Sequence, residues 1–144
     1  MESARQIVAD FLGADVDEIV FTKSATESLN LVAYSYTSLL TKDDSIVVTE
    51  MEHHANLIPW QQLAERTGAT LKWFEVDIEG RLDLSDIDQV ITEDTKIVAI
   101  THQSNVLGTI NPLEAIVARA HEVGAVVVLI GIYLADRSKA AAEN

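Results

Sequence analysis

The sequence predicts an α/β fold with a mostly parallel sheet flanked by helices. Short runs rich in Val and Ile recur along the chain, and stretches with helical periodicity separate them, which is the pattern of βαβ units. The length of 144 residues also suits one domain with one core. No internal repeat or low-complexity segment is evident in the sequence.

The first predicted elements alternate in this way. Residues 3–12 carry apolar side chains at helical spacing, and Gly13 follows where a helix would end. Residues 18–22 form a short β-rich run and are expected to be a strand. A helix start signal precedes the apolar residues of 24–40, which predicts a helix, and residues 45–49 are expected to be a buried strand.

The middle of the chain continues the alternation. Residues 56–66 are predicted to be a helix with Pro59 in its first turn and Gly68 just past its end. Residues 70–76 alternate between polar and apolar side chains and are expected to be a strand. A short helix is predicted at 84–91.

The last predicted elements are a strand at 96–101, a helix at 112–123 that ends before Gly124, and a strand at 126–130. Ligands of parallel α/β sheets bind beyond the carboxyl ends of the strands. Functional residues are therefore expected just after residues 22, 49, 101 and 130.

Composition narrows the classes of partner and of site. The formal net charge is −13, and such a surface repels nucleic acid and anionic membranes. The chain has no cysteine, which excludes disulfides, thiolate metal sites and a cysteine nucleophile. No signal-peptide core and no bilayer-length apolar run is present, so a cytoplasmic location is expected.

Residues 23–27, with the sequence KSATE, follow the first predicted strand and open a helix. Small residues and a hydroxyl at a helix N-terminus can bind an anion, because free N–H groups and the helix dipole point at it. The alternative is an ordinary N-cap formed by Ser24 or Thr26 and completed by Glu27.

Two histidines, His53 and His54, follow the second predicted strand. Neighbouring residues do not share a helix face and no third ligand follows, so a zinc site is not expected. A half-buried, hydrogen-bonded histidine is one interpretation. An imidazole lying over an aromatic ligand is the other.

The predicted strand at 96–101 is followed by the polar residues His102, Ser104 and Asn105. Polar groups beyond a buried strand need hydrogen-bond partners. They either cap their own loop or orient a small polar ligand.

Three motifs together resemble the class V aminotransferase family. They are FTKSATESLN at 21–30, EMEHHANLIPW at 50–60 and THQSNVLGT at 101–109. Within the family they are most similar to SUF-type cysteine desulfurases and selenocysteine lyases, and the resemblance covers residues 3–131. It implies the large domain of a fold-type-I enzyme that depends on pyridoxal 5′-phosphate.

The resemblance also implies roles for individual residues. Ala25 and Thr26 would hold the cofactor phosphate, although the family more often has Gly-Thr-Thr-Glu where this chain has SATE at 24–27. His53 would stack on the pyridine ring and transfer protons, which makes it the catalytic candidate. Asn105 would lie near the phenolic oxygen of the cofactor and the substrate carboxylate. His102 and Gln103 would at most support these residues, without touching the cofactor themselves.

The implied reaction converts L-cysteine to L-alanine and passes sulfur to an enzyme cysteine, or acts on selenocysteine. A sulfur-acceptor protein and a homodimer are the implied partners. PLP acts as the electron sink, while a lysine binds it and an aspartate pairs with its ring nitrogen.

The chain departs from the family near its last predicted strand. Ile130 occupies the aspartate position and Tyr133 a glutamine position, although Gly131 fits. Lys139 comes too early to be the cofactor lysine. We therefore expect an incomplete domain at 1–131 and a polar tail outside the family pattern at 132–144.

A truncation, a frame change or a degenerate gene would each explain these departures. They predict a chain that is inactive alone and self-associates through an unpaired sheet edge. The alternatives are a non-catalytic remnant or binding module, or a kynureninase-like or epimerase relative, against which the paired histidines argue.

Overall fold

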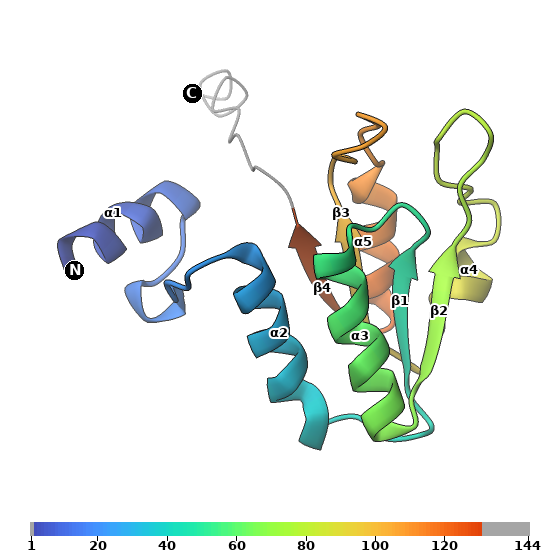
Figure 1. Cartoon of the computed structure of the whole chain (residues 1–144), viewed down its shortest axis with the longest axis horizontal. Coiled ribbons are helices and arrows are strands. Elements are labelled where there is room, and N and C mark those ends of the chain that lie inside the picture. The colour runs from blue at the N-terminus through green and yellow to red at the C-terminus, as the bar shows by residue number, and fades with distance from the viewer. Residues whose placement is uncertain (1, 131–144) are drawn as a thin grey trace.

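A computed structural model describes residues 2–130, and it shows a parallel sheet between two layers of helices (Figure 1). The helices are α1 (Glu2–Leu12), α2 (Ala25–Ser35), α3 (His54–Thr67), α4 (Ile87–Val90) and α5 (Leu113–Glu122). The strands are β1 (Ser45–Thr49), β2 (Thr70–Phe74), β3 (Thr95–Thr101) and β4 (Val126–Ile130). Single 3-10 turns lie at Val16–Glu18 and Tyr36–Ser38.

The sheet has the strand order β2-β1-β3-β4, and neighbouring strands all pair in parallel. The central strand β1 is buried along its whole length, whereas the edge strands β2 and β4 are partly exposed. The predicted fold class, α/β with a mostly parallel sheet flanked by helices, is therefore confirmed.

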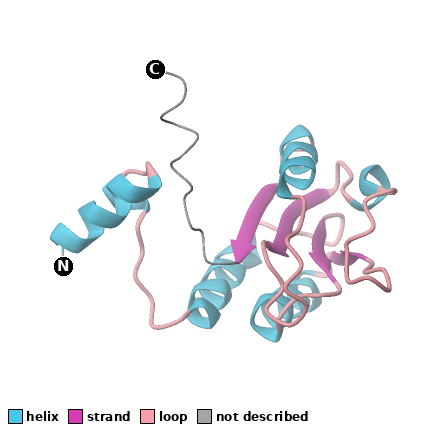
Figure 2. Ribbon diagram, turned by 90° about the horizontal axis from the view of Figure 1, so that it is seen from above, coloured by secondary structure: helices cyan, strands magenta, loops and turns pink. Residues whose placement is uncertain are grey.

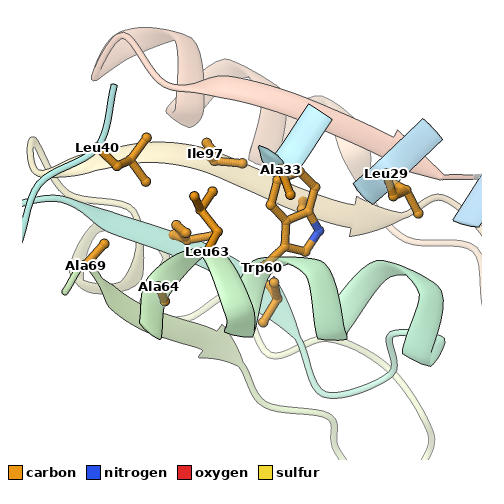
Figure 3. Close-up of a cluster of buried hydrophobic side chains, with 11 residues drawn as sticks. Leu29, Ala33, Leu40, Trp60, Leu63, Ala64, Ala69 and Ile97 are labelled. Atoms are coloured by element: carbon orange, nitrogen blue, oxygen red, sulfur yellow. The ribbon is translucent and has the colours of Figure 1, made fainter. Parts of the chain in front are cut away.

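Alternate side chains of the strands enter two separate cores, as the two-residue period of a strand requires. Ile46 and Val48 of β1 face the core under α2 and α3, and Val47 faces the core that also contains Ile116 of α5. Figure 3 shows the first core, where Trp60 and Leu63 fill the space between α3 and the sheet.

The structure corrects several predicted elements. Residues 18–22 are not a strand: a 3-10 turn ends at Glu18, and Val20 and Phe21 lie exposed in an extended connection. The β-propensity of this run is not realised because no described strand lies beside it. The predicted helix at 24–40 ends at Ser35 and continues as a 3-10 turn, and α4 has only four residues.

Helix α3 begins at His54, two residues before the predicted start, because His53 caps it. Pro59 therefore lies inside the helix rather than in its first turn. The expected C-terminal signal is confirmed, since Gly68 has a φ of 79° and its N–H donates to the carbonyl of Ala64.

Helix α1 stands apart from the sheet at the end of the extended connection (Figure 2). Ile7 and Leu12 on this helix are largely exposed. No helix in the described range is long and apolar enough to cross a membrane.

A polar cluster lies at the amino ends of the strands. Lys72 pairs with Asp94 at 3.2 Å, and the Ser45 and Thr95 hydroxyls bond each other at 3.1 Å. Hydrogen bonds from the Thr92 hydroxyl first, then from Ser45 and Lys72, lower the pKa of Asp94 to about 2.

Candidate functional site

The site lies between β1 and β3, where the chain's path across the sheet reverses. The chain leaves β1 through α3 toward β2 on one side, and it leaves β3 through α5 toward β4 on the other. Such a switch point leaves a crevice at the carboxyl ends of the central strands. A pocket of about 650 Å³ opens there, lined by Ala25, His53, Thr101, His102, Gln103, Ser104, Asn105, Gly108 and Ile130.

The N-terminus of α2 forms one wall of the pocket. The Ser24 hydroxyl accepts a hydrogen bond from the backbone N–H of Glu27 at 3.2 Å, so the predicted N-cap is present. The cap leaves the backbone N–H groups of Ala25 and Thr26, and the Thr26 hydroxyl, without an acceptor among the described residues. Ala25 lines the pocket, whereas Thr26, the next residue in the chain, is not among the residues that line the pocket.

His53 lies at the N-terminus of α3 and has a structural role there. Its Nδ1 accepts a hydrogen bond from the backbone N–H of Ala55 at 3.1 Å, so the ring proton of the neutral imidazole is on Nε2. The ring is exposed at the pocket, and the neighbouring His54 ring is tilted by 53° at a centroid distance of 6.3 Å. Within residues 2–130, no group of three or more His, Asp or Glu side chains could hold a metal.

The segment after β3 shows both behaviours that the sequence left open. The buried Ser104 hydroxyl accepts hydrogen bonds from the N–H groups of Val106 and Leu107 and so caps its own loop. The exposed Asn105 side chain bonds no other described residue and lines the pocket. Asn105 is thus available to a ligand.

A buried polar network supports this segment, and the sequence analysis missed it. Glu52 accepts hydrogen bonds from the Thr49 hydroxyl at 2.7 Å, from Asn56 Nδ2 at 2.6 Å and from the Thr101 N–H at 2.8 Å. Trp60 Nε1 donates to Asn56 Oδ1 at 3.0 Å.

Burial raises the pKa of Glu52, and its three hydrogen bonds act against that rise. The signal in the sequence was the spacing of Asn56 and Trp60 by four residues, which places both on the helix face that meets the core, while Glu52 precedes this helix.

Three of the four predicted site residues, Ala25, His53 and Asn105, line one pocket although they come from distant parts of the chain. Ile130 lines the same pocket and also packs against the first core. The described lining residues include no Asp, Glu, Lys or Arg. Gly131, Tyr133 and Lys139, which were compared above with positions of the family pattern, lie outside the described residues.

Comparison with known proteins places these features in a wider group. Residues 1–131 match the family described as Aminotransferase class-V. A probable cysteine desulfurase of Streptomyces coelicolor is 57% identical over 135 residues, which cover 88% of this chain and 32% of that protein. A cysteine desulfurase of Haloferax volcanii is 47% identical over 133 residues, which cover 90% of this chain and 31% of the relative.

Solved structures agree with the sequence matches. The apo cysteine desulfurase of Thermococcus onnurineus superposes with a TM-score of 0.83 at 48% identity, over 89% of this chain and 32% of that one. CsdA of Escherichia coli, a cysteine desulfurase in its S-sulfonic acid form, gives a TM-score of 0.81 at 37% identity, over 89% and 33% of the two chains. The chain thus spans about a third of the length of these relatives.

Proposed function

The chain belongs to the aminotransferase class-V family, and we propose on this premise that it forms one part of a cysteine-desulfurase cofactor site. That part holds the phosphate of pyridoxal 5′-phosphate and covers one face of its ring. We further propose that the described residues do not carry out desulfuration by themselves.

The phosphate end of the cofactor fits the described residues, and this observation carries the proposal. Ala25 and Thr26 offer two backbone N–H groups and a hydroxyl at the positive end of an eleven-residue helix. The cap on Ser24 orders this turn without using those donors. His53 lies in the same pocket and offers a flat imidazole surface to an aromatic ring.

The nitrogen end of the cofactor does not fit. A pyridine nitrogen stays protonated in a protein when a carboxylate lies beside it, and the described pocket lining has none. Ile130, which the resemblance assigns to the aspartate position, lines the pocket and offers only an apolar side chain. When bound and protonated, the cofactor supplies an electron sink, and an apolar neighbour weakens that function.

The remaining family expectations apply to a longer protein that contains these residues. Its proposed substrate is L-cysteine or selenocysteine, and its proposed partners are a sulfur-acceptor protein and a second copy of the chain. The relatives named cysteine desulfurase support this substrate class. The second candidate function, a binding module without catalysis, is favoured for the present chain by Ile130.

Calorimetric titration of the 144-residue chain with pyridoxine 5′-phosphate tests the proposal. This compound lacks the aldehyde, so it does not react with surface lysines, and unphosphorylated pyridoxine is its control ligand. We expect the phosphorylated compound to bind more tightly, inorganic phosphate to compete with it, and Thr26→Ala to weaken it. Thr70→Ala, an exposed threonine at the amino end of β2, is the matched control and should leave binding unchanged.

Equal binding of both ligands would refute the phosphate site. Catalysis is tested separately by incubation with pyridoxal 5′-phosphate and cysteine. We expect no release of alanine and no adduct on one specific lysine after borohydride reduction. Alanine release, or a specific adduct at Lys139, would overturn the proposal that the chain is inactive alone.

A further inference from the structure

We propose that Glu52 is a positioning residue of this site, which holds His53 and the segment bearing Asn105 in a fixed mutual arrangement. The role in ligand binding rests on the proposed function above. The role in positioning rests on the contacts of Glu52 alone.

Glu52 connects three elements that build the pocket. Its Oε1 accepts from the hydroxyl of Thr49 at the end of β1 and from the N–H of Thr101 at the end of β3. Its Oε2 accepts from Asn56 in the first turn of α3. Thr101 lines the pocket, and so does His53, which follows Glu52 in the chain. The hydrogen bonds of Glu52 therefore join two parts of the pocket wall.

Two donor-only groups, the Trp60 indole N–H and the Thr101 backbone N–H, determine the direction of the hydrogen bonds that connect them through Asn56 and Glu52. An indole N–H only donates, so Trp60 requires the oxygen of the Asn56 amide, and the Asn56 NH₂ group must then face Glu52. The backbone N–H of Thr101 also only donates. Both side-chain oxygens at position 52 must therefore accept hydrogen bonds. A carboxylate can do this, whereas a neutral amide has one oxygen and one NH₂ group and cannot.

A single substitution should therefore break the network. In Glu52→Gln the new NH₂ group faces that of Asn56, and a flip of the Asn56 amide would only move the conflict to Trp60. In Asn56→Asp two carboxylates face each other in a buried place. Either change leaves a buried polar group unsatisfied, so each single variant should unfold at a lower urea concentration than the original chain.

The double variant E52Q/N56D should repair the network. The amide oxygen at position 52 then accepts from Thr49 and Thr101, and the amide NH₂ group there donates to the new carboxylate at position 56. That carboxylate also accepts from Trp60. The number of hydrogen bonds and the net charge are then the same as in the original chain. Glu65→Gln, an exposed change on α3, is the control for losing one acidic group.

Nuclear magnetic resonance of the His53 ring and of the Asn105 side-chain amide tests positioning without any ligand. We expect E52Q to shift both sets of signals, E52Q/N56D to return them, and E65Q to leave them unchanged. Unshifted signals in E52Q, or signals that the double variant does not return, would overturn the positioning role. Failure of the original chain to bind a ligand would affect only the proposed function.

Titration with pyridoxine 5′-phosphate then tests the consequence for binding. We expect E52Q to weaken binding about tenfold, equivalent to about 1.4 kcal/mol, and the double variant to return it to within about twofold. If E52Q lowered the unfolding midpoint but left the ring signals and the affinity unchanged, Glu52 would stabilise the core only. That result would refute the proposal.

Discussion

His53 has two roles that substitution can separate. Its Nδ1 caps α3, and its ring faces the pocket. Alanine at this position removes both functions, whereas asparagine keeps an N-cap oxygen and removes the ring. We therefore expect H53A to lose stability and affinity, and H53N to lose affinity alone.

The expected magnitudes follow from these contacts. The cap is a single 3.1 Å hydrogen bond at an exposed position, so H53A should cost about 1 kcal/mol of unfolding free energy, or about 3 °C in melting temperature. Loss of stacking on an aromatic ligand is worth about 0.5–1.5 kcal/mol, which weakens binding about two- to tenfold. The same loss of affinity is expected for both variants.

Urea denaturation followed by circular dichroism measures the stability of each variant, and calorimetric titration with pyridoxine 5′-phosphate measures affinity. A loss of stability in H53N as large as that in H53A would refute the capping role. Unchanged affinity in H53A would show that the imidazole does not face the ligand.

Three further outcomes are expected from urea denaturation. Leu63→Ala, at a fully buried position, should cost about 2–5 kcal/mol, while Leu39→Ala, where the side chain is 66% exposed, should cost below about 0.5 kcal/mol. Asp94→Asn should destabilise the chain at pH 7, and its deficit should shrink as pH falls from about 4 toward 2, because hydrogen bonds hold the folded pKa of Asp94 at about 2.

Much of the fold was predictable because it depends on local patterns. The strands 45–49 and 126–130 were predicted with the bounds that the structure shows, since Val and Ile runs in a buried parallel sheet have few alternatives. The run at 18–22 has similar composition but no neighbouring strand among the described residues, and a β-rich sequence alone cannot supply one.

The site was predictable in part. A histidine at a helix start and an asparagine after a strand have recognisable positions, and His53 and Asn105 do meet in one pocket. The contact from Glu52 to Thr101 joins residues 49 positions apart, which no local pattern reveals. The separation of Ala25 from Thr26 at the pocket wall likewise depends on how α2 is turned toward the sheet.

The strand order also has a consequence for how the molecule folds. Strands β1 and β2 with α3 form one local βαβ unit, whereas the bond between Ser45 and Thr95 closes a loop of 50 residues. Closing a long loop lowers the entropy of the chain before the contacts between its ends have formed. The pairing of β1 with β3 is therefore expected late in folding. An early intermediate would carry His53 on a formed helix but no pocket. The rate at which the chain gains ligand affinity during refolding should therefore follow β1–β3 pairing and lag behind the gain of helical signal.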